Sequence, residues 1–221
     1  MSAGVQSLAP RDPELPSEPE RLADPPGLRH DQTLSAVLLD DVDLAGQRAR
    51  GVSLDEAVVR ATDLSTSRLE QLSLTDVELS GCNLSNAAAE RARLNRVSVR
   101  GCRLTGLLVS AALLQDVTFT GCRIDLASFS ASRLQRVTFD DCRLEQTDFM
   151  DAQLQDVRFH DSDLTGVDFR GATLRRCEAR GSALSAIRGV DRLRGLAMPW
   201  AEIVANADVW AGALGIARLD G

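Results

Sequence analysis

The sequence contains five cysteines, whose thiols could bind a metal or take part in redox chemistry. Four of them recur at a spacing of twenty residues. Zinc sites are usually built on cysteine pairs only a few residues apart, and the sequence contains no CxxC pair. We therefore interpret these residues as reduced, buried thiols that pack as small apolar side chains. A metal or redox column is the alternative. The four are Cys82, Cys102, Cys122 and Cys142, and the fifth is Cys177.

The two histidines, His30 and His160, form no catalytic constellation with the other residues of the sequence. His30 lies in a proline-rich stretch, and His160 is expected to point outward without a partner. The sequence also lacks a glycine-rich phosphate-binding loop. We therefore expect a protein that is not an enzyme, with no catalytic residue, no cofactor and no metal.

Carboxylates gather in one part of the chain. Residues 140–168 contain nine acids and two arginines, and residues 170–194 contain seven arginines and two acids. We interpret the acidic stretch as a surface that binds a basic partner, with an ordinary solvated surface as the alternative. A net charge of −7 argues against direct nucleic-acid binding. We define the acidic belt as Asp140, Asp141, Glu145, Asp148, Asp151, Asp161, Asp163 and Asp168.

A period of five residues organises the chain that positions these groups. Every fifth residue from Leu34 to Leu184 is apolar, and all six phenylalanines occupy such positions. A helix has a period of 3.6 residues and a half-buried strand has a period of 2. A fixed short period of another length is typical of a solenoid.

The repeats resemble the pentapeptide repeat family, whose consensus is A(D/N)LXX. The best matches are VDFRG at Val167–Gly171, SDLTG at Ser162–Gly166 and TDFMD at Thr147–Asp151. The resemblance covers about 157 residues. It implies an all-β solenoid, a right-handed quadrilateral β-helix in which four pentapeptides form one coil and the central residues point inward.

Correlations at a spacing of twenty residues support four sides independently of the resemblance. Phenylalanines, valines and cysteines each recur at this spacing, so like residues are expected to stack on like. One series alternates in charge at every step, which predicts a ladder of ion pairs between coils. A glycine and aspartate series, which includes Gly81 and Asp141, predicts a corner with positive φ. The charged series is Asp76, Arg96, Asp116, Arg136, Asp156 and Arg176.

The sequence divides into three regions. Residues 1–31 contain six of the seven prolines and are expected to be a disordered tail. Residues 32–188 form the β-helix, with underfilled repeats in residues 32–66 and near Ala89. Residues 189–221 are expected to cap the open end of the core and to form a homodimer, with a helix over residues 199–214. The dimerisation residues are Trp200, Ile203, Trp210 and Leu214.

No stretch of the sequence is apolar enough for a signal peptide or a membrane span, so we expect a cytoplasmic protein without membrane contact. Resemblance to the quinolone-resistance type of the family implies an acidic, dimeric rod that mimics DNA and binds DNA gyrase or another type II topoisomerase. Resistance to inhibitors of that enzyme is the role that this implies. The alternative is a scaffold or protein-interaction solenoid with an unrelated partner.

Overall fold

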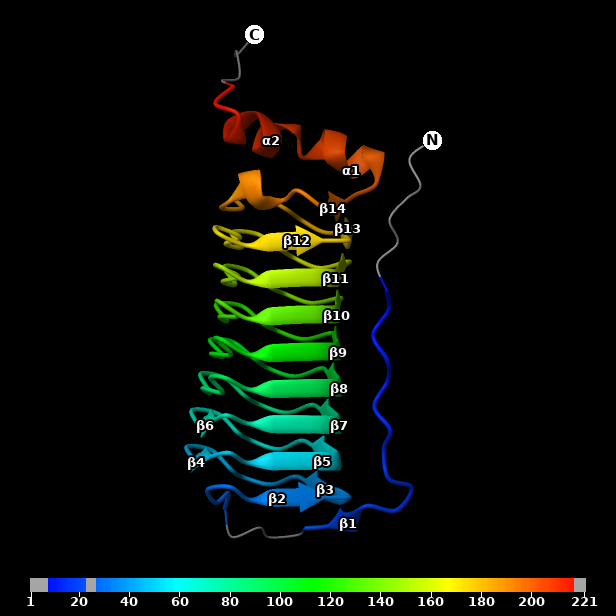
Figure 1. Cartoon of the computed structure of the whole chain (residues 1–221), viewed down its shortest axis with the longest axis vertical. Coiled ribbons are helices and arrows are strands. Elements are labelled where there is room, and N and C mark those ends of the chain that lie inside the picture. The colour runs from blue at the N-terminus through cyan, green and yellow to red at the C-terminus, as the bar shows by residue number, and fades with distance from the viewer. Residues whose placement is uncertain (1–7, 23–26, 217–221) are drawn as a thin grey trace.

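The computed structural model describes residues 8–22 and 27–216, and most of them form one stack of parallel strands. Figure 1 shows the strands lying one above the other along the long axis of the molecule. Each residue pairs with the residue twenty positions further along the chain, as in the pairs of Val137 with Val157 and Phe139 with Phe159. This register confirms the β-helix of four pentapeptides per coil.

The strands differ in length, and the longest extend over two adjacent walls of the coil. Six consecutive coils share an eight-residue strand of this kind, and isolated bridges at the same spacing complete the other walls. The strands are β1 (Glu20–Arg21), β2 (Thr33–Ser35), β3 (Val37–Asp40), β4 (Arg48–Arg50), β5 (Ser53–Arg60), β6 (Arg68–Glu70), β7 (Ser73–Ser80), β8 (Arg93–Arg100), β9 (Leu113–Thr120), β10 (Arg133–Asp140), β11 (Gln153–His160), β12 (Thr173–Arg175), β13 (Cys177–Arg180) and β14 (Leu196–Ala197).

Corners of the coil are formed by residues with positive φ. The glycine and aspartate corner behaves as predicted, with φ of 62° at Gly81 and 51° at Asp141. The bend inside each long strand also has positive φ, for example 53° at Arg136. A residue with left-handed backbone conformation turns the chain from one wall of the coil to the next, while the flanking residues stay extended.

The bore of the helix is filled by the fifth-residue series. Within that series only Leu34, Leu84 and Leu94 are partly exposed, and the others are buried. Phenylalanines stack in two columns, with ring centroids 4.9 Å apart for Phe119 and Phe139 and 5.2 Å apart for Phe129 and Phe149. Rings of the two columns meet edge to face, a favourable aromatic geometry.

The five cysteines are free and buried, as the sequence predicted. Their thiols donate weak hydrogen bonds to backbone carbonyls, as Cys142 does to Asp140 at 3.3 Å. Burial raises the pKa of the Cys177 thiol to about 11. The cysteines therefore contribute to packing as small apolar residues.

The interior is incompletely filled around Ala89. A cavity of about 50 Å³ lies there, at the level of β7 to β9, where small residues replace the leucine or phenylalanine found in other coils. This agrees with the underfilled repeat expected from the sequence. Its walls include Leu74, Leu79, Leu84, Ala89, Ala92, Val99 and Phe119.

The C-terminal end is covered by a 3-10 helix, η1 (Val190–Arg192), and two short helices, α1 (Trp200–Ala205) and α2 (Ala207–Ala213). The single helix expected over residues 199–214 is wrong, because the chain breaks at Asn206, where φ is −102°. Pro199 precedes α1 as its N-cap residue and does not occupy the first helical position. Figure 1 shows α1 and α2 lying across the end of the stack.

The N-terminal segment does not have the path of a disordered tail. Residues 8–22, which we call the N-terminal strap, run along the outside of the rod in the direction opposite to coil growth (Figure 1). The strap ends in β1, which pairs in parallel with β3 beneath the first coils. Among the described residues, no helix is long and apolar enough to cross a membrane.

Candidate protein-binding surface

The charged ladder lies at the corner where each long strand bends, and it consists of three separate ion pairs at alternate steps of the predicted series. Arg136 donates from Nε to Asp116 Oδ1 at 2.5 Å and from Nη2 to Oδ2 at 2.8 Å. Arg176 and Asp156 form the same bidentate pair at 2.7 and 2.5 Å, and Arg96 pairs with Asp76 in the same way. Each arginine therefore holds the carboxylate of the preceding coil in a fixed orientation.

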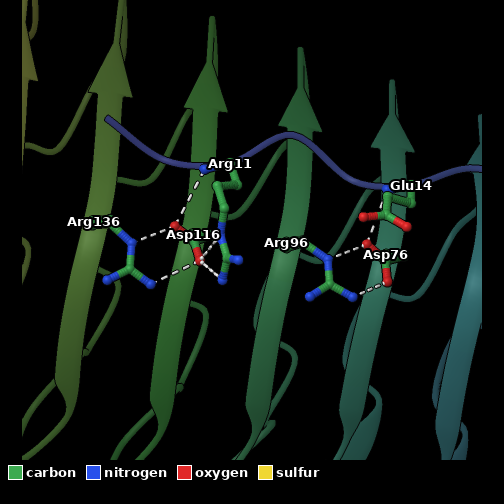
Figure 2. A network of polar contacts seen from close by, with 6 residues as sticks. All are labelled: Arg11, Glu14, Asp76, Arg96, Asp116 and Arg136. Atoms are coloured by element: carbon green, nitrogen blue, oxygen red, sulfur yellow. Dashed lines mark hydrogen bonds and ion pairs between the residues drawn. The ribbon is translucent and has the colours of Figure 1, made fainter. Parts of the chain in front are cut away.

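The N-terminal strap lies on this ladder and donates backbone N–H groups to its carboxylates. Leu8 N donates to Asp156 Oδ1 at 3.2 Å, Arg11 N to Asp116 Oδ1 at 3.2 Å and Glu14 N to Asp76 Oδ1 at 2.9 Å. Figure 2 shows the last two contacts, with the strap crossing the strands above the ladder. The same carboxylate oxygen accepts from the strap and from the arginine Nε at all three positions.

Arg11 makes the most extensive contact of the strap. Besides its backbone N–H, its Nε and Nη2 donate to Asp116 Oδ2 at 3.0 and 2.8 Å. Asp116 is 0% exposed and lies between Arg11 and Arg136. Burial alone would raise the pKa of Asp116, but hydrogen bonds from the two guanidinium groups outweigh it and hold the pKa well below its usual range.

The contact between the strap and the ladder was not predicted, although the sequence of the strap contains a signal for it. Pro10, Pro13, Pro16 and Pro19 are spaced by three residues, which is the period of a polyproline II helix. Their number predicts disorder, whereas their regular spacing predicts an extended segment of one conformation. A periodic proline series beside an alternating charged series therefore indicates an ordered segment.

The acidic belt lies further along the rod and wraps around several of its sides. Three of its members, Asp141, Asp151 and Asp161, are exposed, and Asp140 is half-buried. In the described part of the chain these four carboxylates make no ion pair. Asp141 and Asp161 occupy the same corner of consecutive coils, so their charges lie one above the other.

The other belt residues are engaged locally. Asp168 is buried and pairs with Arg170 at 2.6 Å. Glu145 pairs with Arg143 at 2.7 Å, and Asp148 accepts from Met150 N at 2.7 Å. Asp163 accepts from Thr165 N at 2.9 Å. The belt therefore contains four available carboxylates and four that stabilise the rod.

Positive charge interrupts the negative surface next to the belt. Arg103, Arg123 and Arg143 stack on one wall at the twenty-residue spacing, and Asp163 continues the same series. His160 was expected to have no partner, but its Nε2 lies 2.6 Å from Glu178 Oε1. The surface is thus a patchwork, because the excess of acids in residues 140–168 is followed by an excess of arginines in residues 170–194.

The residues expected to dimerise fall into two groups. Trp210 is half-buried against the core, and its Nε1 donates to Ile203 O at 2.8 Å. Trp200 and Leu214 are each 76% exposed. Exposed Val204 lies one helical turn after Trp200 in α1, and exposed Ile216 lies two residues after Leu214, beyond the end of α2. The first group anchors the cap, while the second leaves apolar side chains in solvent. We call Trp200, Val204, Leu214 and Ile216 the C-terminal apolar patch.

The comparisons with known proteins agree with this architecture. A model of the pentapeptide repeat region matches residues 72–139 and 115–188, more than half of the chain. None of the curated proteins is similar to the chain in sequence.

Solved structures of pentapeptide repeat proteins are also similar. HetL, a protein involved in heterocyst differentiation regulation from Nostoc sp. strain PCC 7120, is 20% identical over 77% of this chain and 91% of its own, with a TM-score of 0.35. A trypsin-treated form of QnrB1, a plasmid-mediated fluoroquinolone resistance protein, is 15% identical over 86% of this chain and 100% of its own, with a TM-score of 0.48. On the strength of the family model and the twenty-residue register, the chain belongs to the pentapeptide repeat family.

Proposed function

We propose that this protein is a non-enzymatic binding protein whose acidic belt binds a basic surface of a protein partner. The observation that carries the proposal is the group formed by Asp140, Asp141 and Asp161, which make no ion pair with other described residues. Carboxylates without a partner in the same chain can neutralise arginines and lysines of another protein without first breaking internal pairs.

The charge density of this region supports mimicry of DNA. Residues 140–168 span about one and a half coils, or roughly 7 Å at strand spacing, and have a net charge of −7. Duplex DNA carries one charge per about 1.7 Å, hence roughly four over the same length. Of these carboxylates, Asp140, Asp141, Asp151 and Asp161 make no ion pair in the described residues, so the available negative charge over this length is similar to that of DNA.

A type II topoisomerase is the partner to test first, because resemblance to the quinolone-resistance type implies DNA gyrase. Supercoiling by gyrase is measured with and without this protein, and with and without a quinolone. We expect inhibition of supercoiling, or protection from the quinolone, that is lost in the variant Asp140→Asn, Asp141→Asn, Asp161→Asn. The matched control Asp41→Asn, Glu70→Gln, Glu90→Gln removes the same charge from exposed positions of the first coils.

The alternative, a scaffold with an unrelated partner, is favoured by one specific observation. The column of Arg103, Arg123 and Arg143 prevents a continuous negative face along that wall. A gyrase assay with no inhibition, no protection and no binding would decide for this alternative. The belt triple variant would then serve to test whichever partner is captured.

A further inference from the structure

The N-terminal strap and the charged ladder match in period. The strap donors Leu8, Arg11 and Glu14 are three residues apart, and their acceptors Asp156, Asp116 and Asp76 are two coils apart. Three residues of polyproline II rise about 9.3 Å, and two coils at strand spacing rise about 9.6 Å. A polyproline II helix therefore presents one backbone N–H to every second coil without distortion.

An extended β-strand could not make the same contacts. Residues three apart in a strand point to opposite faces, whereas residues three apart in polyproline II point in the same direction. Proline also restricts the preceding residue to extended conformations. The prolines at 10, 13 and 16 thus hold the strap in its bound shape before binding, which lowers the entropy cost of docking.

The acceptors form a built and repeated site. Each ladder aspartate is at most 5% exposed and is oriented by an arginine of the next coil. At each position Oδ1 receives the strap N–H and the arginine Nε together. The same geometry occurs three times at one spacing. Together the three positions form a surface that binds its ligand through the ligand's backbone N–H groups.

We propose that this corner of the rod is a binding site for a polyproline II peptide with proline at every third residue. The strap is its resident ligand in cis, and a proline-rich segment of another chain with the same register can replace it in trans. The middle position selects arginine, because Arg11 places two side-chain hydrogen bonds on Asp116 in addition to its backbone bond. The common polyproline II sites are aromatic-lined grooves, whereas this site binds its ligand through backbone N–H groups that donate to carboxylates.

Amide hydrogen exchange of the intact protein, followed by NMR, tests the cis complex. We expect the amides of Leu8, Arg11 and Glu14 to exchange at least tenfold more slowly than those of Ala9, Asp12 and Leu15. Asp116→Asn should remove most of the protection at Arg11, because it loses the charge of the acceptor. The control Asp140→Asn, outside the strap contact, should leave it unchanged. Equal exchange rates for the six amides would overturn the proposal.

The period itself is tested by insertions between Arg11 and Asp12. One inserted alanine shifts the N–H of Arg11 out of register, so protection at Leu8 and Arg11 should be lost. Inserting the three residues Ala-Pro-Arg adds one full turn, so the N–H of the inserted arginine reaches Asp116 and that of Arg11 reaches Asp156. Both of these amides should be protected, and Leu8 should lose its protection. If both insertions have the same effect on amide protection, binding does not depend on the three-residue register and the proposal is wrong.

Binding in trans is tested with a labelled peptide of the sequence LAPRDPELPSEP, which copies residues 8–19. In the intact protein the tethered strap competes at high effective concentration, so the peptide should bind weakly. The one-alanine variant, whose fold is checked by circular dichroism, should bind the peptide at least tenfold more tightly. A peptide with one proline moved by one residue is the control. No binding to the variant, or equal binding of the control peptide, would exclude exchange in trans.

Discussion

Arg136 and Asp116 form a bidentate ion pair between consecutive coils, and the carboxylate in that pair is 0% exposed. Removing Arg136 takes two hydrogen bonds from this carboxylate and leaves Arg11 as its remaining cation. Arg136→Met should therefore lower the free energy of unfolding by about 2 kcal/mol, measured by urea denaturation. Arg133→Met is the matched control, because Arg133 lies on the same strand, β10, and is exposed. Equal losses in the two variants would show that the pair does not stabilise the rod.

Acid should weaken the ladder and the strap together. Hydrogen bonds from Arg96 lower the pKa of Asp76, and those from Arg176 lower the pKa of Asp156. An aspartate whose pKa is lower in the folded state stabilises the fold above its unfolded pKa of about 3.9, and this contribution is lost as the pH falls below that value. The melting temperature should therefore fall steeply below about pH 4.

The variant Asp116→Asn distinguishes the contribution of the ladder to the pH dependence of stability from general acid denaturation. It removes the ionisable group that Arg136 and Arg11 share, so its melting temperature should fall less steeply with decreasing pH than that of the natural sequence. Asp161→Asn, an exposed position of a neighbouring coil, should keep the natural slope. Parallel curves for all three proteins would exclude a role for the ladder in the pH dependence.

Filling the cavity beside Ala89 should stabilise the protein. Val109, one coil above, shows that the same series accommodates valine, and the cavity of about 50 Å³ provides room for the added methyl groups. Ala89→Val should raise the free energy of unfolding by about 1 kcal/mol, seen as an increase of about 3 °C in melting temperature. Ala152→Val is the control at a fully buried alanine that does not line the cavity, and it should destabilise by overpacking. A loss of stability in Ala89→Val would mean that the space cannot accept a larger side chain.

The C-terminal apolar patch should mediate association of two chains. Trp200 is 76% exposed, and large aromatic residues in solvent are typical of interfaces. Light scattering should give the mass of a dimer for the natural sequence and of a monomer for Trp200→Glu. Leu126→Glu, an equally apolar residue that is 57% exposed on the side of the rod, should remain dimeric. A monomer at every concentration of the natural sequence would refute this prediction.

The interior and the ladder could be predicted because one short period determines both. Phe119 and Phe139 stack because each occupies the central position of its repeat, and the register follows from the repeat length alone. Asp116 and Arg136 meet for the same reason. Where a contact lies within the repeat, spacing in the sequence is a direct measure of distance in space.

Contacts between the repeats and the rest of the chain could not be predicted in this way. Arg11 and Asp116 are 105 residues apart, and no period connects them. The break at Asn206 separates α1 from α2, which contacts η1, and the apolar spacing of Trp200 and Trp210 does not specify that contact. Among the belt residues, only the structure separates Asp168, held by Arg170, from the available Asp161.

Both ends of the stacked sheet carry a covering strand, and this limits how the rod can grow. β1 pairs with β3 beneath the first coils, and β14 pairs with β13 above the last ones. A bare terminal rung would template another molecule and lead to filaments. With the first rung occupied, an association of two chains through the opposite end would stop at a closed pair instead of continuing as a polymer.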